Sequence, residues 1–108
     1  MPTTFFLGEF EQLVLLALLQ LGDGGHALPL RTELSRVAGR NVSRGALYRT
    51  LDRLEEKKYV EWETEEDVPK RGGHPRRRFS VTPEGIRALR ASRAALMELW
   101  SGVEEVLK

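Results

Sequence analysis

The sequence predicts a mainly α-helical fold with a small β-hairpin, an α+β chain that forms one domain. Three observations support this prediction. Apolar residues recur at helical spacing in four segments, two short segments alternate between apolar and polar residues, and glycine or proline separates most of them. With 108 residues the chain has the size of one domain, and a domain this small buries only about two-thirds of its unfolded surface.

Composition narrows the classes of function. Hydrophobic residues make up 41% of the chain and charged residues 31%, as is typical of a globular protein. With no cysteine and only His26 and His74, the chain lacks the ligands for a disulfide, a thiolate metal site or a multi-histidine site. The apolar run from Leu13 to Leu19 is too short to cross a bilayer, and the N-terminus lacks the basic region of a secretory peptide. We expect a cytoplasmic protein with no membrane segment, metal or cofactor.

The first predicted helix covers residues 8–21 and ends at the glycines of 22–25. Leu15, Leu16 and Leu19 fall outside its core-facing stripe, so the helix is apolar nearly all round and needs a second surface to cover it. The stripe itself has the i, i+3, i+4, i+7 spacing and consists of Phe10, Leu13, Val14, Ala17, Leu18 and Leu21.

A second helix follows after the glycines. Pro29 fits its first turn, and the helix runs to about Ala38 and ends at Gly39. We expect its inner face to consist of Leu30, Leu34 and Val37.

Ser43 is a favourable N-cap for a third helix, which we expect to end near Lys58. Its core-facing residues stand at i, i+4 and i+7 and are Leu47, Leu51 and Leu54.

A hairpin is predicted next. Residues 59–65 alternate as a strand with Val60 and Trp62 on one face, and residues 77–81 alternate again with Phe79 and Val81 inward. The connection between the strands, residues 66–76, contains two glycines and two prolines, which indicates an extended loop.

The last predicted helix begins with Thr82 as cap and Pro83 in its first turn, and we expect it to reach the C-terminus. Its length of about 25 residues corresponds to roughly 38 Å, so most of it would project beyond the domain. Apolar or small residues follow it at the 3-4 spacing of a helix-pairing seam: Leu89, Ser92, Leu96, Leu99, Val103 and Val106.

This order of elements is that of a winged helix-turn-helix extended by a long C-terminal dimerisation helix. We expect residues 1–81 to form the DNA-binding domain and residues 82–108 the dimerisation helix, with the helix of residues 8–21 also at the dimer interface. The expected interface residues are Leu13, Leu16, Leu89, Leu96, Leu99, Trp100, Val103 and Val106.

Charge is distributed unevenly along the chain, although the net charge is only +1. Residues 31–53 contain six arginines against Glu33 and Asp52, and residues 70–78 contain five basic residues and no acid. The seven acids of residues 55–67 lie between these two segments. Because a partner responds to local fields, the two basic segments indicate two surfaces for an anionic partner.

Both basic segments fall on the elements that a winged helix directs to DNA. In a helix-turn-helix the second helix, here residues 43–58, is the recognition helix and enters the major groove. We expect Arg44 and Arg49 to bind base edges or phosphate, Tyr48 a phosphate or thymine, and Arg53 phosphate. Gly45 would allow close approach of the backbone. The remaining predicted contacts are Ser43 at the start of the helix and the wing residues Lys70, Arg71, Arg76, Arg77 and Arg78.

Four segments carry a resemblance to a known family: Leu7 to Glu11, Ser43 to Glu55, Arg71 to Gly73, and Phe79 to Gly85. Taken together, they resemble the PadR family of bacterial transcriptional regulators. The resemblance covers about residues 7–90 and implies a winged-helix homodimer that acts as a repressor at palindromic operators on double-stranded DNA.

Two departures from the family pattern are present. Residues 26–29 read His-Ala-Leu-Pro where the family often has Tyr-Gly, and Lys58 stands where glycine is common. The single C-terminal helix resembles the shorter branch of the family, in which some members sense small aromatic compounds at the dimer interface. Trp100 could line such an effector site, but a large aromatic residue beside an apolar seam is more often interface packing.

Two alternative functions differ from DNA binding. The chain could be a protein interaction module in which the basic segments are incidental, and this alternative predicts no salt-dependent affinity for DNA. An enzyme would need an activated nucleophile, an acid–base pair or a metal site. The acids of residues 55–67 have no adjacent histidine, and Arg71-Gly72-Gly73 connects two strands and is not a phosphate-binding loop before a helix. We therefore expect a non-enzymatic protein.

Overall fold

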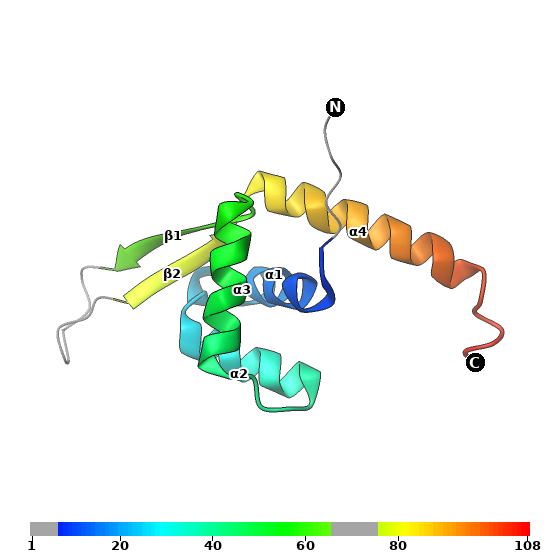
Figure 1. The fold of residues 1–108 in the computed structure, drawn as a ribbon, viewed down its shortest axis with the longest axis horizontal. Coiled ribbons are helices and arrows are strands. Elements are labelled where there is room, and N and C mark those ends of the chain that lie inside the picture. Colours follow the sequence, from blue (N-terminus) through cyan, green and yellow to red (C-terminus); the bar gives the residue numbers. More distant parts are fainter. Residues whose placement is uncertain (1–6, 66–75) are drawn as a thin grey trace.

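The computed structural model describes residues 7–65 and 76–108, which fold around one core (Figure 1). The order of elements agrees with the prediction. They are α1 (Glu9–Leu21), a short 3₁₀ turn (Gly22–Gly24), α2 (Ala27–Ala38), α3 (Arg44–Glu56), β1 (Val60–Glu65), β2 (Arg76–Val81) and α4 (Pro83–Ser101). In these residues no helix is both long and apolar enough to cross a membrane.

The core lies where α1, α2 and α3 meet the inner face of the hairpin. Helix α1 is at its centre and contacts α2, α3, β2 and α4. Leu15 was expected off the core-facing stripe of α1, yet it is fully buried because neighbours cover the helix on more than one side. Leu16 and Leu19 remain about half exposed. The second apolar surface of α1 is thus only partly covered by this chain.

The inner face of α2 is shorter than predicted. Leu30 and Leu34 are buried, but Val37 is 54% exposed. Val37 lies in the last turn of α2, at the rim of the domain, where Gly39 adopts a left-handed conformation with φ of 69° and the chain turns towards α3.

The turn between α2 and α3 is held by two side chains of α2. Arg31 Nε donates to the carbonyl oxygen of Val42 at 3.0 Å, and the Val42 N–H donates to Ser35 Oγ at 3.0 Å. Val42 itself is buried. The backbone N–H and C=O of the buried residue Val42 are therefore both satisfied by side chains of α2, which fixes the turn between the two helices of the helix-turn-helix.

The hairpin pairs β1 with β2 in antiparallel register, with Val60 opposite Val81 and Trp62 opposite Phe79. Val60 and Phe79 are buried, whereas Trp62 is 37% exposed. The chain before α2 adds to the far edge of β2, where the Phe79 N–H donates to the Gly25 carbonyl at 2.8 Å. A Cβ at residue 25 would collide with the Phe79 carbonyl oxygen, so this approach requires glycine.

The start of α4 agrees with the prediction. Hydrogen bonds hold it to the chain that follows α3. Thr82 Oγ1 accepts from the Gly85 N–H at 3.0 Å and donates to the Lys58 carbonyl at 2.7 Å. A Cβ at residue 85 would collide with the Tyr59 carbonyl oxygen. The Thr-Pro-Glu-Gly sequence thus combines a helix cap with a close contact that only glycine permits.

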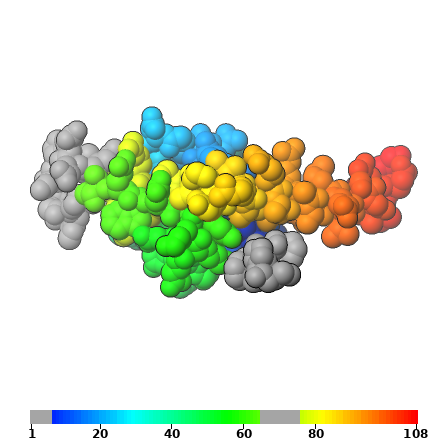
Figure 2. Space-filling model, turned by 90° about the horizontal axis from the view of Figure 1, so that it is seen from above, coloured from blue at the N-terminus to red at the C-terminus, as the bar shows by residue number. Residues whose placement is uncertain are grey.

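The end of α4 differs from the prediction. The helix ends at Ser101 and does not reach the C-terminus. Gly102 follows it, and the next residues form i to i+3 turns, with the Val103 N–H bonded to the Trp100 carbonyl and the Val106 N–H to the Val103 carbonyl. Glycine loses more backbone entropy in a helix than any other residue, and no packing offsets this loss here. The second half of α4 projects from the domain (Figure 2).

Lys58 is the one non-glycine residue with a positive φ, 66°, among the residues that the structure describes. It stands between α3 and β1, at the position where glycine is common in the family that the sequence resembles, and its side chain is exposed. A left-handed conformation costs a residue with a Cβ about 1–2 kcal/mol.

We predict that Lys58→Gly stabilises the fold by about 0.5 kcal/mol, because relief of this strain exceeds the extra entropy of the unfolded chain. Gly39→Ala is the matched control in the opposite direction and should destabilise by about 1 kcal/mol. Urea unfolding at one fixed protein concentration measures both. A Lys58→Gly variant that is less stable than the parent would contradict the strain argument.

Candidate nucleic-acid interface

Helix α3 presents its basic side chains to the outside. Leu47, Leu51 and Leu54 are buried as predicted, and Thr50 joins them on the inner face. The Ser43 hydroxyl caps the helix by accepting from the Ala46 N–H at 3.1 Å. The exposed residues of this element are Ser43 at the cap, then Arg44, Gly45, Arg49, Asp52 and Arg53, and at the end of the helix Glu55 and Glu56.

Gly45 and Arg49 occupy the same part of the outer face, one turn apart. A Cβ at residue 45 would lie 3.4 Å from Arg49 Nη1, so the guanidinium of Arg49 folds back over the glycine. Glycine at this position leaves room for that guanidinium beside the helix backbone.

Tyr48 joins the recognition helix to the hairpin. Its ring lies between two guanidinium groups, with Arg44 Cζ 5.6 Å and Arg77 Cζ 5.4 Å from the ring centroid. Arg77 also lies 4.9 Å from the ring of Trp62 and 5.8 Å from that of Phe79. Cation–π contacts of this kind contribute about 0.5–1 kcal/mol each at exposed sites. Arg77 therefore links β2 to α3 and holds this strand beside the recognition helix.

A concave surface of about 790 Å³ lies between the starts of α2 and α3 and the strand β2. Its lining includes Arg44, Tyr48, Arg76 and Arg77, together with His26. Residues from the recognition helix and from the wing thus converge on one basic concavity, which we call the wing-side concavity.

The other predicted wing residues are placed differently. Arg78 pairs with Glu63 directly across the hairpin, so part of its charge is neutralised within the chain. Lys70 and Arg71 lie outside the described residues.

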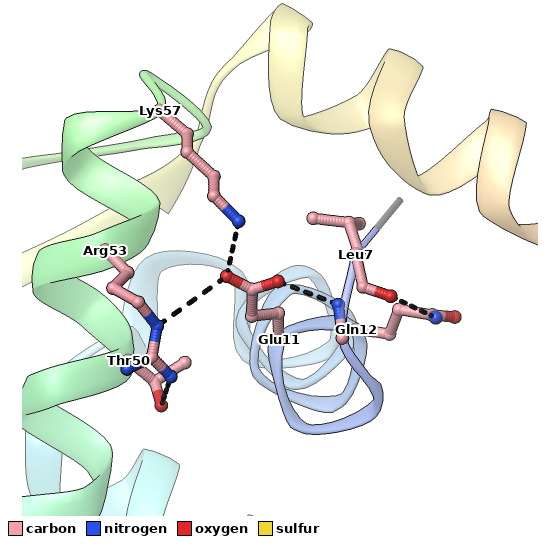
Figure 3. A network of polar contacts seen from close by, with 7 residues as sticks. Leu7, Glu11, Gln12, Thr50, Arg53 and Lys57 are labelled. Atoms are coloured by element: carbon pink, nitrogen blue, oxygen red, sulfur yellow. Dashed lines mark hydrogen bonds and ion pairs between the residues drawn. The ribbon is translucent and has the colours of Figure 1, made fainter. Parts of the chain in front are cut away.

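Arg53 contacts a carboxylate that the sequence analysis did not single out. Glu11, in the first turn of α1, is buried, and its Oε2 accepts a hydrogen bond of 2.8 Å from Lys57 Nζ (Figure 3). Arg53 Nε lies 4.0 Å from the same oxygen, while its Nη2 donates to Thr50 Oγ1 at 3.3 Å. Glu11 Oε1 accepts from the Gly8 N–H at 2.8 Å. One carboxylate thus caps α1 and ties it to α3.

The sequence contains a signal for this role. Glu11 stands four and seven residues before Leu15 and Leu18, which places it on a buried face of α1. A charged residue at a core position is rarely buried without a partner.

Burial by itself raises the pKa of the Glu11 carboxyl, but hydrogen bonds from Lys57 and Gly8 and the charges of Lys57 and Arg53 hold that pKa below its ordinary value of 4.5. The carboxylate is therefore ionised at neutral pH. Among the described residues no group of three histidine or acidic side chains could hold a metal ion.

Comparison with known proteins agrees with this geometry. The profile of the transcriptional regulator PadR-like family matches residues 15–91. The chain belongs to the PadR-like family of transcriptional regulators. This regulator therefore belongs to a family of DNA-binding transcription factors with a winged-helix fold, and it is not an enzyme.

Solved structures show the same fold. A PadR family transcriptional regulator from Eggerthella lenta is 29% identical, with a TM-score of 0.68 over 93% of this chain and 87% of its own. A PadR-like regulator from Bacillus cereus is 21% identical, with a TM-score of 0.72 over 92% of this chain and 91% of its own. No curated protein is significantly similar to the regulator in sequence.

The Glu11 contact predicts a pH dependence of stability. A carboxylate whose pKa is lower in the folded chain stabilises the fold above its ordinary value of 4.5, and this stabilisation is lost as pH falls through the lowered pKa. We expect Glu11→Gln to destabilise the regulator by about 1–2 kcal/mol at pH 7, because Lys57 and Arg53 lose their anionic partner.

Urea unfolding between pH 7 and pH 3 measures this effect, and the difference from the parent should shrink below the ordinary pKa. Glu9→Gln is the matched control, since Glu9 is exposed in the same helical turn. A Glu11→Gln variant whose deficit is unchanged at low pH would show that the carboxylate charge is not the stabilising feature.

Proposed function

We propose that the regulator is a sequence-specific repressor that binds a palindromic operator as a homodimer in the bacterial cytoplasm. The observation that carries this proposal is the convergence of Arg44, Tyr48, Arg76 and Arg77 on the wing-side concavity, beside the outward face of α3. DNA binding by a winged helix requires two features. They are hydrogen-bond donors for bases on the recognition helix and a basic wing beside that helix.

The proposed division of roles follows the order of elements. Residues 1–81 bind DNA, with Ser43, Arg44, Gly45, Tyr48 and Arg49 at the major groove and Arg53 and the wing at phosphates. Residues 82–108, together with α1, form the dimer interface.

Exposed apolar side chains support a second copy of the chain as the partner. A groove of about 430 Å³ between α1 and α4 is lined by Leu16, Leu19, Leu89, Leu96 and Trp100 among others. Leu99, further along α4, is 73% exposed. Monomeric proteins rarely expose a continuous apolar patch of this kind, and a two-fold dimer would pair it with the same patch of its partner.

Other expected interface residues lie at the margins of this patch. Leu13 is half buried and packs against the core of its own chain, and Val103 and Val106 lie beyond the end of α4 with their side chains exposed.

Trp100 carries a second proposed role. Its side chain is half exposed in the groove, next to Leu96 and Met97. Packing against the partner helix is the simpler role for it, and an aromatic effector that releases the operator would occupy the same apolar space.

The DNA proposal is tested by fluorescence anisotropy with a labelled duplex from upstream of the regulator's own gene and a scrambled duplex. A dimer with about eight phosphate contacts should show a slope of roughly −7 in log K against log salt. Arg49→Ala should weaken binding to the upstream duplex by about 1–3 kcal/mol, more than to the scrambled one.

Arg87→Ala is the control, because Arg87 is exposed on α4 and pairs with Glu84. Absence of binding to either duplex at low salt would favour a protein interaction module instead.

The dimer proposal makes a separate prediction. Replacing Leu96 and Leu99 with glutamate places charges in the apolar patch and should yield monomers in analytical ultracentrifugation. The matched control is Val37→Glu, because Val37 is an exposed apolar residue on α2, outside the groove. A dimer that survives the double substitution would refute this interface.

A further inference from the structure

A second concave surface lies on the other flank of the recognition helix. Its volume is about 350 Å³, and its lining includes Arg40, Asn41, Arg49 and Arg53 above the ring of Phe10. No acidic side chain is among the described residues that line it. Three guanidinium groups around one depression make a strongly cationic surface, which we call the turn-side concavity because Arg40 and Asn41 belong to the turn between α2 and α3.

The two concavities lie on opposite sides of α3. Arg44 and Tyr48 form the row that borders the wing-side concavity, and Ala46, Arg49 and Arg53 form the row that borders the turn-side concavity. At 100° per residue the two rows are separated by roughly 150° around the helix axis. The ridge between them carries Gly45 and Asp52, and it is the part of α3 that faces outward.

The dimensions of DNA match this arrangement. A helix with its side chains is about 10–12 Å across and fills a major groove about 12 Å wide, whose two walls are the phosphate backbones of the two strands. When the outward ridge of α3 faces the bases, Arg44 and Arg49 lie on either side of this ridge, and each concavity lies beside a different wall. Arginine suits this contact because its planar fork donates two hydrogen bonds to one phosphate.

Arg53 is already oriented for such a contact. Its guanidinium is held by Thr50 Oγ1 at 3.3 Å and by the buried Glu11 at 4.0 Å, yet its side chain remains 55% exposed (Figure 3). A side chain that is ordered before binding loses less entropy when it binds.

We propose that the turn-side concavity binds backbone phosphates of the DNA strand opposite to the strand that the wing contacts. Arg40 and Asn41 supply contacts from the turn, and Arg53 supplies a contact from α3. Arg49 lines the edge of the concavity nearest the outward ridge, where it stays available to base edges. The proposal rests on the proposed DNA-binding function and assigns a separate strand to each flank of the recognition helix.

Ethylation interference on the upstream duplex tests the assignment directly. Ethylated phosphates that block binding of the parent protein should fall on both strands bordering one major groove. Because the two protomers of a dimer on a palindrome contact opposite strands, the pattern is compared within one half-site. There, Arg40→Gln should weaken the interference on one strand, and Arg76→Gln should weaken it on the other. An unchanged pattern with Arg40→Gln, or weakening on the same strand of the same half-site for both variants, would overturn the proposal.

Salt dependence gives a second measurement on the same variants. Arg40→Gln should reduce the slope of log K against log salt by about 0.9 for each phosphate that the variant no longer neutralises. Arg40→Lys should have the slope of the parent protein, because lysine keeps the positive charge. The control is Arg36→Gln, which removes one exposed arginine that pairs with Glu33 and lines neither concavity. Equal slopes for Arg40→Gln and the parent would refute the contact.

The two proposals fail separately. If the parent protein binds no duplex, the DNA-binding function itself is refuted. If the parent binds and Arg40→Gln behaves as Arg36→Gln does, DNA binding stands and only the turn-side site is refuted.

Discussion

The buried carboxylate of Glu11 is the contact on which the DNA-facing surface depends. Removing a carboxylate from water is costly, and here the cost is offset by Lys57 and by the Gly8 N–H. These donors come from the end of α3 and the start of α1, so one side chain satisfies the α1 terminus and fixes the recognition helix against it. Arg53 takes its orientation from the same carboxylate.

With α3 anchored in this way, the rest of the interface is built from side chains on its two flanks. On one flank Tyr48, Arg77 and Trp62 join the hairpin to the helix, so the strands β1 and β2 are positioned by cation–π contacts as well as by strand pairing. On the other flank the turn held by Arg31 and Ser35 places Arg40 beside Arg49. Small displacements of α3 would therefore change both flanks together.

The same compact core explains the apolar surface that remains. The first half of α4 packs on the domain, up to the buried Ser92. After Ser92, the side chains of Leu96, Leu99 and Trp100 are exposed. Leu16 and Leu19 of α1 line one groove together with Leu96 and Trp100. A chain of this size has too few elements to cover two faces of α1, and a second copy is the partner that we propose for the remainder.

Caps, breakers and apolar spacing act within a few residues, so they predict the order of elements and the basic faces from the sequence alone. Ser43, Gly39 and Thr82 bound their helices as predicted. Contacts between distant segments are the reason that Leu15 is buried, that Val37 is exposed, that α4 ends at Ser101, and that Glu11 and Arg77 join separate elements. These outcomes depend on which distant segments cover a given side chain, and local periodicity holds no information about that.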